Sequence, residues 1–521
     1  MKMTKLFFGM RIFGIIAMIS TMLHSCTKDY AEINTDKSAI PTVGEAELPF
    51  LFSRAISAIP VGDQVAQNLF ADQYAQYFAC NAAYFPSDRY VMVSDWVQNN
   101  FDPMYTVVLP QLQVLLDKKD AASAEAALAN IWWVYAFHRV TDYWGPIPYF
   151  SIGVGGLSVP YDPQDKIYDD FFKRLAAAVQ VLEDKRDEKP YDTYDLVYGG
   201  NVDKWIKFAN TLRLRLAVRI SKVDPGRAKT EAEAAYAGGV FTQSPDDDAY
   251  IPKNTLDINR LSQMSDWNEF RMSATMESIL KGFNDPRMPV YFLPAKSTGT
   301  YEGLRNGLTP EQLALEVNTV NSNSHVGPRW TSLASGGIAN HLSTPANVMC
   351  AAEAYFLRAE GALLGWNMGG TAKDLYEQGI TNSMMQWEVT DNAVIQDYIN
   401  GTTTPIAPGD YMNSPAITDI PVKFDAGNID VQLEQIATQK WLALFPDGME
   451  AWADYRRGHY NKLYPIVKSD NPELTDPETQ WIRRIPFLLS EKISNGPAVD
   501  AAVGLLGGPD AITTPLWWDK N

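Results

Sequence analysis

Cys26 is the side chain whose position most restricts its chemistry, because it follows an apolar run and precedes a charged segment in TMLHSCTKDY, residues 21–30. A thiol at this position could be a buried side chain, half of a disulfide, a metal ligand, or the attachment point of a lipid. The possibilities imply different cell compartments. The residues on either side of the cysteine therefore bear directly on function.

The residues before Cys26 favour lipid attachment. Lys2 and Lys5 give a basic start, and Leu6–Leu23 is apolar apart from Arg11 and a few small polar residues. This is the pattern of a signal peptide, with a hydrophobic region that is slightly long and interrupted by one charge. The alternative is a plain anchor helix in which the cysteine is incidental.

The ending Leu23-His24-Ser25-Cys26 resembles a bacterial lipobox, in which the cysteine is acylated and becomes the new N-terminus. His24 stands where such a motif usually has a small residue. Several acyl chains on one residue hold a protein at a bilayer, whereas a single chain binds only marginally. We predict a lipoprotein signal peptide over 1–25, a lipidated N-terminus and tether over 26–45, and Cys26 as the lipid anchor.

The other cysteines and the histidines indicate no metal site. Cys80 in YAQYFAC and Cys350 in NVMCAAEAY lie in helix-like apolar contexts, which predict buried free thiols rather than a disulfide. No pair of histidines has metal-ligand spacing among His24, His138, His325, His341 and His459.

Enzyme signatures are weak. With 62 acidic residues, carboxylate pairs suited to glycoside hydrolysis arise by chance, and the sequence contains neither G-x-S-x-G nor H-E-x-x-H. The run Asp246–Asp248 in SPDDDAY could bind calcium but lacks the spacing of a calcium loop, so we expect a solvated acidic turn. We expect Asp285 and Arg287 to brace a turn. The sequence predicts no catalytic residues, metal or cofactor.

The charge of the chain argues against a nucleic-acid partner. The formal net charge is −18, and without the three bases of residues 1–25 the chain retains 41 bases against 62 acids, a net charge of −21. Such a surface repels nucleic acid and anionic lipid. No other stretch is long and apolar enough to cross a bilayer.

Helical periodicity dominates the rest of the sequence. Apolar residues recur at helical spacing in segments 126–145, 203–222, 349–366, 372–387 and 432–445. In segment 203–222 the residues Arg213, Arg215 and Arg219 lie mostly off the apolar face. Tryptophans on helix-like segments should be core residues, namely Trp132, Trp133, Trp205, Trp366, Trp387 and Trp441.

The helical segments come in pairs with recurring Ala and Gly, which is typical of degenerate tetratricopeptide units that bury their apolar faces against neighbours. Turn residues increase in two stretches, about 221–345 and about 388–430. We predict a mainly α fold with little strand, in which tetratricopeptide-like helical pairs pack against a loop-rich, irregular region. Long loops of this kind are usually functional or disordered.

An ordered set of segments resembles the SusD/RagB family of outer-membrane lipoproteins, SusD-like branch. After the lipobox the set contains YAEINTDKSAIP, VTDYWGPIPYF, YDPQDKIYDDFFKRL, FNDPRMPVYF, AAEAYFLRAEGALLGW, QKWLALFPDGMEAWADYRRG and RRIPFLLSEKISN. The resemblance implies one body over residues 46–521 with about four tetratricopeptide-like units. It also implies an outer-membrane location, and Lys28, Asp29 and Glu32 resemble the signal that exports such lipoproteins to the cell exterior.

The resemblance implies a binding protein rather than an enzyme. Family members capture oligosaccharides, or in some cases peptides, and pass them to a SusC-type TonB-dependent outer-membrane transporter. The expected function is therefore glycan capture for such a transporter. Three alternatives remain open: a peptide binder, a surface glycoside hydrolase, and a helical scaffold that binds no ligand.

The resemblance also indicates where a ligand would bind. Family members that bind starch use an arc of aromatic residues from an early loop and the irregular middle region. Here the early stretch, residues 81–105, offers rings, amides and a guanidinium suited to stacking on sugars and bonding their hydroxyls. In the middle region two aromatic residues lie among turn residues, so we expect them to be exposed. The candidate ligand-binding residues are Tyr84, Arg89, Trp96, Asn99, Asn100, Tyr301 and Trp330.

Overall fold

The computed structural model describes residues 43–153, 158–332, 338 and 340–521. The predicted signal peptide and Cys26 lie outside the described residues, as do residues 26–42 of the tether. Residues 50–521 form one compact unit. None of the helices in the described ranges combines the length and the apolar character that a membrane crossing needs.

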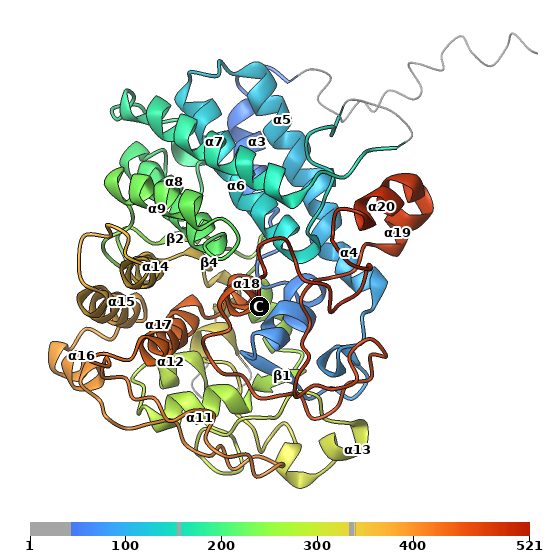
Figure 1. The fold of residues 1–521 in the computed structure, drawn as a ribbon, viewed down its shortest axis with the longest axis vertical. Coiled ribbons are helices and arrows are strands. Elements are labelled where there is room, and N and C mark those ends of the chain that lie inside the picture. The colour runs from blue at the N-terminus through green and yellow to red at the C-terminus, as the bar shows by residue number, and fades with distance from the viewer. Residues whose placement is uncertain (1–42, 154–157, 333–337, 339) are drawn as a thin grey trace, which may run out of the picture. The chain divides into compact units, whose positions relative to one another are not determined.

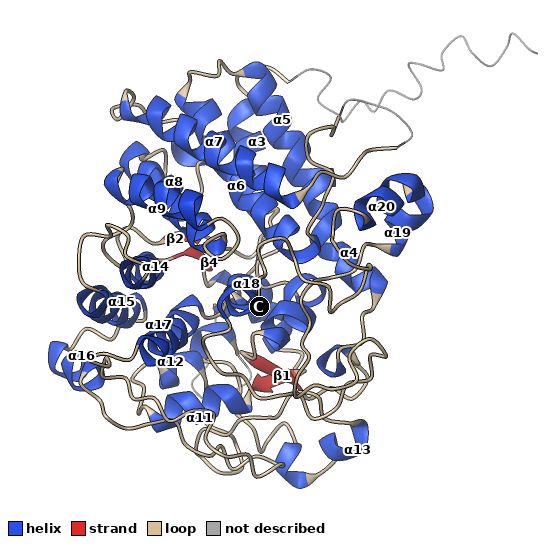
Figure 2. Cartoon of the chain, in the orientation of Figure 1, coloured by secondary structure: helices blue, strands red, loops and turns tan. Residues whose placement is uncertain are grey.

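Most regular structure in the described ranges is helical, as the sequence predicts (Figure 2). In the first half of the chain the helices are α3 (Leu48–Ser57), α4 (Ser94–Pro103), α5 (Leu109–Lys118), α6 (Ala124–Trp144), α7 (Gln164–Glu183), α8 (Val202–Arg219) and α9 (Pro225–Ala237). The later helices are α10 (Arg260–Ser265), α11 (Ala274–Gly282), α12 (Met288–Tyr291), α13 (Pro310–Leu313), α14 (Ala351–Leu363), α15 (Ala372–Gln386), α16 (Asn392–Ile399), α17 (Ile429–Leu444), α18 (Gly448–Gly458), α19 (Leu489–Ser494) and α20 (Gly496–Val503). Short turns of 3-10 or π helix connect several of them.

Consecutive helices pack as pairs. α6 contacts α7, α8 contacts α9, α14 contacts α15, and α17 contacts α18. Neighbouring pairs also touch, because α7 packs on α8 and α14 packs on both α8 and α17. Figure 1 shows α6–α9, α14, α15 and α17 following one another along one side of the ribbon. This arrangement confirms the predicted tetratricopeptide-like scaffold.

The ends of α6 show how the sequence defines a helix. Ser123 precedes it, and its hydroxyl accepts a hydrogen bond from the backbone N of Ala126 at 3.1 Å. The helix ends at Gly145, whose φ of +84° is poorly tolerated by residues with a Cβ. Between these ends nearly every side chain is buried, so α6 lies in the centre of the scaffold.

The predicted buried residues lie in the core. Each of the six tryptophans predicted to be core residues is 8% exposed or less. Cys80 and Cys350 are buried free thiols, which confirms that prediction.

Strands are few and short in the described ranges. β1 (Phe78–Cys80) pairs antiparallel with β3 (Phe270–Met272), and β2 (Ala249–Ile251) pairs antiparallel with β4 (Ala346–Met349). Each two-stranded sheet joins segments that are far apart in the sequence and lies among loops (Figure 2).

The two predicted loop-rich stretches contain helices that the sequence analysis did not distinguish. The stretch from 221 contains α9, which begins at Pro225 after a cap by Asp224 and buries Ala228, Ala232 and Ala235. Alanine gives only a weak hydrophobic period, so this helix lacked a clear sequence signal. The stretch from 388 likewise contains α16, capped by Asp391.

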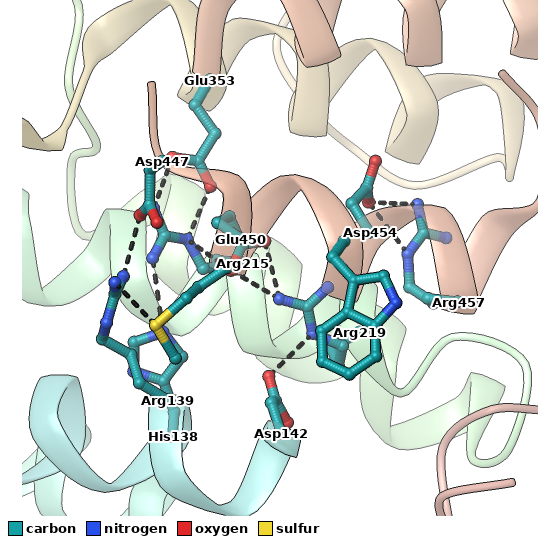
Figure 3. A network of polar contacts seen from close by, with 12 residues as sticks. His138, Arg139, Asp142, Arg215, Arg219, Glu353, Asp447, Glu450, Asp454 and Arg457 are labelled. Atoms are coloured by element: carbon teal, nitrogen blue, oxygen red, sulfur yellow. Dashed lines mark hydrogen bonds and ion pairs between the residues drawn. The ribbon is translucent and has the colours of Figure 1, made fainter. Parts of the chain in front are cut away.

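A buried network of ion pairs links the helical scaffold (Figure 3). We use the name charge network for three groups of these ion pairs. One is Arg139 of α6 with Asp447. The second joins Asp142 of α6, Arg215 and Arg219 of α8, Glu353 of α14 and Glu450 of α18, and the third joins Glu360 of α14, Lys440 of α17, and Asp454 and Arg457 of α18. The sequence analysis placed Arg215 and Arg219 mostly off the apolar face and gave no sign that they are buried. Both side chains are 1% exposed. They are stabilised by acids from other helices.

Candidate functional site

Exposed aromatic side chains gather beside the β1–β3 sheet. Tyr84 follows β1 and is 68% exposed, and Trp267 precedes β3 and is 49% exposed. Phe85 and Trp96 are partly exposed. The ring centroids of Tyr84 and Phe85 are 4.6 Å apart and those of Phe85 and Trp96 are 5.4 Å apart. We call Tyr84, Phe85, Trp96 and Trp267 the aromatic surface.

Hydrogen bonds hold the two segments of the aromatic surface together. The backbone N of Asn81 donates to the carbonyl of Glu269 at 3.1 Å, and its side-chain Nδ2 donates to the carbonyl of Asn268 at 3.0 Å. The Tyr84 hydroxyl donates to the Glu269 carboxylate. This bond is the main cause that raises the pKa of Tyr84 to about 12. Tyr84 therefore stays protonated, with its ring fixed at the surface.

A buried carboxylate anchors the loop that carries Tyr84. Asp88 accepts hydrogen bonds from the backbone N of Cys80 at 3.3 Å, from Asn306 Nδ2 at 2.7 Å and from the backbone N of Gly307 at 3.0 Å. Burial raises the pKa of Asp88 to about 6. The loop is thus tied to β1 and to the irregular middle region.

Three of the candidate residues are buried. Trp330, expected to be exposed, is 2% exposed and packs against Trp387 and Phe445 with both centroid distances 5.7 Å. Arg89 pairs with Asp470 at 2.6 Å and donates to the carbonyl of Leu308, so it braces two loops. Asn100 is fully buried. The expected exposure of Trp330 is therefore wrong, because turn residues around an aromatic ring do not report what packs on it.

The remaining candidates differ in their surroundings. Trp96 belongs to the aromatic surface. Asn99 is exposed and donates to the carbonyls of Asp95 and Trp96 in its own helix, at 2.9 and 3.2 Å. Tyr301 is partly exposed and lies in the loop next to Glu302, which lines a separate polar cavity of about 250 Å³. The structure thus brings Tyr84 and Trp96 together.

The sequence analysis missed two residues of the aromatic surface, Phe85 and Trp267. Trp267 lies in QMSDWNEF, among Ser265, Asp266 and Asn268. These turn residues are the same kind of signal that singled out Tyr301, so Trp267 could have been found. Its place in the segment that bonds Asn81 and Tyr84 depends on the pairing of β1 with β3, which spans almost 200 residues.

The acidic turn is solvated only at Asp246, which is exposed, and the prediction is wrong for Asp247 and Asp248. Asp247 is 4% and Asp248 5% exposed. Asp247 accepts from Lys207 Nζ at 2.8 Å and from the backbone N of Thr242 at 2.7 Å, and Asp248 accepts from the backbone N of Ala351 at 2.7 Å. These carboxylates are buried because they close the turn onto neighbouring helices. The described ranges hold no group of three or more acids, histidines or cysteines arranged to bind a metal ion.

Asp285 and Arg287 brace a turn as predicted. Arg287 Nε lies 2.9 Å from Asp285 Oδ1, and Nη2 lies 2.6 Å from Oδ2, with both side chains fully buried. Arg287 also donates to Ser383 of α15 and to Gln439 of α17, at 2.6 and 3.0 Å. The pair therefore fixes the loop after α11 to the scaffold.

The charge network is sealed from ligands. The cavity lined by His138, Asp142 and Glu450 has a volume of about 10 Å³, far below the roughly 300 Å³ at which small-molecule sites begin. Burial, and next the neighbouring Arg215, lower the pKa of His138 well below 6.5, so it is neutral at pH 7. The network stabilises the packing of helices.

The aromatic surface can bind by stacking and hydrogen bonding. The faces of Tyr84 and Trp267 suit the apolar faces of sugar rings. Glu269 bonds the Tyr84 hydroxyl, and Asn81 bonds the carbonyl of Asn268, the residue after Trp267. The carboxylate of Glu269 already accepts from Tyr84 and from Gln64, the latter at 2.5 Å. A helical body that presents exposed rings on loops is suited to binding a ligand.

The chain belongs to the SusD-like family, described as SusD and RagB outer-membrane lipoproteins, whose model matches residues 45–519. A chitin-binding SusD homolog from Flavobacterium johnsoniae is 36% identical, with a TM-score of 0.83, over 91% of this chain and 99% of that one. A SusD homolog from Bacteroides uniformis is 33% identical, with a TM-score of 0.81, over 92% and 100% of the two chains. A chitin-binding protein is 26% identical, with a TM-score of 0.76, over 91% and 100%. A comparison with curated proteins gives no match.

Proposed function

We propose that this protein is a lipoprotein of the outer membrane that faces the cell exterior, binds a glycan on its aromatic surface, and delivers it to a SusC-type TonB-dependent transporter. Cys26 would carry the lipid. The single observation that carries the glycan assignment is the pair of exposed rings, Tyr84 and Trp267, held on two bonded loop segments. The similarity to a chitin-binding homolog supports the same ligand class.

We expect no covalent chemistry at this surface. Glu269 is already engaged by Tyr84 and Gln64. Asp266 lies 2.7 Å from His341 Nε2 and accepts from Ser332 Oγ at 3.2 Å. Acids held in this way position loops. Incubation of the protein with an oligosaccharide panel should release no new reducing ends, and sustained hydrolysis would favour a surface glycoside hydrolase instead.

Calorimetric titration with chito-oligosaccharides and malto-oligosaccharides tests the binding surface. Trp267→Ala and Tyr84→Ala should each weaken binding by about 1 kcal/mol or more, which is roughly fivefold or more, because each removes a stacking ring. Phe150→Ala is the matched control, since Phe150 is also exposed, at 51%, but lies outside the aromatic surface. Unchanged affinity in both test variants would refute the site. Binding of peptides with no binding of glycans would favour a peptide-binding member of the family.

Co-purification tests the transporter partnership. Mild detergent extraction of the lipidated protein should bring a large β-barrel protein with it. Isolation of the protein without such a partner under conditions that preserve known outer-membrane complexes would contradict delivery to a transporter.

A further inference from the structure

A cavity at the end of α18, which we call the second cavity, is distinct from the aromatic surface. It has a volume of about 280 Å³ and lies between the end of α18 and the C-terminal segment that contains Asn461 and Trp481. None of the four residues of the aromatic surface lines it. Its size is close to the lower end of the roughly 300–1,000 Å³ that ligand sites occupy.

Three adjoining aromatic rings, tilted against one another, form one wall of this cavity. The ring centroids of Tyr455 and His459 are 4.5 Å apart, and those of His459 and Trp481 are 4.0 Å apart. Burial lowers the pKa of His459 to about 4, so the imidazole is uncharged at neutral pH. The charged lining residues Lys462 and Glu478 are exposed to solvent. The wall is therefore aromatic and electrically neutral.

Polar groups in the cavity lack protein partners. Among the residues that the structure describes, none exchanges a hydrogen bond with His459 Nε2 or Trp481 Nε1, and both atoms are buried. The side chains of Tyr90, Tyr455 and Asn461 line the same cavity. Neighbouring lining groups are satisfied, since Gln76 donates to the carbonyl of Tyr464 at 2.5 Å and Trp452 donates to the carbonyl of Ile482 at 3.2 Å. Buried polar side chains are nearly always hydrogen-bonded, so unpartnered groups that line one cavity point to a ligand.

The chemistry of the cavity selects the ligand class. Adjoining aromatic rings suit the apolar face of a flat or ring-shaped group, and two hydroxyls, one amide and the unpartnered ring nitrogens can donate to and accept from hydroxyl groups. Apart from the exposed Lys462 and Glu478, the lining carries no charge, so it offers no buried partner for a charged ligand, whose burial would carry a large desolvation penalty. A neutral polyhydroxylated ring fulfils all three conditions.

We propose that this cavity is a second glycan subsite, which holds one sugar unit through Tyr90, Tyr455, Asn461 and the adjoining rings of His459 and Trp481. The choice of a sugar rests on the proposed function. The existence of the subsite rests on the cavity and its unpartnered groups. With two subsites, a short sugar would bind this chain at two independent places.

Calorimetric titration of the full chain in detergent with the disaccharide of N-acetylglucosamine, and in parallel with maltose, tests the proposal. At least one disaccharide should bind with two sites per chain. Combining Tyr455→Phe with Asn461→Leu should remove one site or weaken it at least about fourfold, because each change removes one hydrogen bond worth roughly a factor of two or more. Trp267→Ala should affect the other site. Tyr194→Phe, which removes the hydroxyl of an exposed tyrosine elsewhere, is the control.

The outcomes separate this proposal from the proposed function. Suppose that the sugar binds at one site, that Trp267→Ala abolishes this binding, and that Tyr455→Phe with Asn461→Leu leaves it unchanged. This result would overturn the second subsite and retain the aromatic surface. Absence of binding by either sugar would overturn both. Thermal unfolding of each variant establishes that it is folded, and Tyr455→Phe alone, which changes one atom, repeats the test if the double variant does not fold.

Discussion

Arg215 of α8 and Glu353 of α14 form a two-point ion pair, in which the Nε–Oε1 and Nη2–Oε2 distances are both 2.6 Å (Figure 3). Both side chains are 1% exposed. The pair joins two helix pairs that lie more than 130 residues apart in the sequence. It therefore couples the first half of the scaffold to the second.

Removal of one partner should be far more costly than removal of both. Arg215→Met leaves the Glu353 carboxylate buried and unpaired, so we expect a loss of roughly 3–5 kcal/mol in the free energy of unfolding. Arg215→Met combined with Glu353→Leu should lose less, because no uncompensated acid remains at that position. Chemical denaturation measures both values.

The matched control is Arg186→Met. Arg186 pairs with Asp203 at the surface, where the side chains are 52% and 61% exposed, so its loss should cost less than about 1 kcal/mol. Equal losses for Arg186→Met and Arg215→Met would show that burial does not determine the value of these pairs.

Trp330→Ala should lower the free energy of unfolding without weakening ligand binding. Trp330 packs against Trp387 and Phe445 in the core, and removing a buried tryptophan costs about 3–5 kcal/mol. Trp267→Ala should show the opposite pattern, with stability nearly unchanged and glycan affinity reduced. Thermal melts and titrations of the two variants, made side by side, distinguish a core ring from a binding ring.

The free energy of unfolding should fall as pH rises from about 4 to 7, because of the ionisation of Asp72. Burial, and to a lesser degree the nearby Asp447, raise the pKa of Asp72 to about 7 from 3.8. Above pH 4 the folded protein thus retains a proton on Asp72 that the unfolded chain has released. This difference in proton binding stabilises the folded protein fully at low pH, and the stabilisation is lost as pH rises through 7.

Asp72→Asn mimics the protonated acid and removes this contribution. The variant should match the wild type near pH 4 and exceed it at pH 8 by an amount on the order of 4 kcal/mol, from the pKa difference. Denaturation at both pH values measures the effect. A variant less stable than the wild type at pH 8 would show that the carboxylate is ionised and stabilising in the folded protein.

Cys26→Ser should abolish lipid attachment. Mass spectrometry of the wild-type protein from envelopes should find an acylated Cys26 at the N-terminus, and the variant should move from the detergent phase to the aqueous phase on partitioning. Cys80→Ser is the control that keeps the lipid, because Cys80 is a buried thiol. An unmodified Cys26 in envelope material would contradict the anchor and the location that depends on it.

The strongly periodic helices could be predicted from the sequence, and α9 and α16 could not. Segments 126–145 and 203–222 carry large apolar residues at helical spacing, so they indicate α6 and α8 directly. α9 buries only alanines, and α16 is eight residues long, so both resemble loops in a stretch rich in turn residues. A weak period in a short window does not distinguish a helix from a loop.

Burial within loops was the least predictable property. Trp330 and Trp267 both lie among turn residues, yet one is 2% and the other 49% exposed. The difference depends on Trp387 and Phe445, which approach Trp330 from distant helices. A sequence gives the type of a side chain and its local conformation, but it does not give the distant groups that cover it.

The sequence by itself determined the helical scaffold, the core tryptophans of its periodic segments and the chemistry available for ligand binding, because these depend on residue type and short-range spacing. Only the tertiary structure decided which rings reach the surface, which arginines are buried, and which polar groups of the second cavity lack partners. Those properties arise from contacts between segments that are not neighbours in the sequence, and local periodicity carries no information about them.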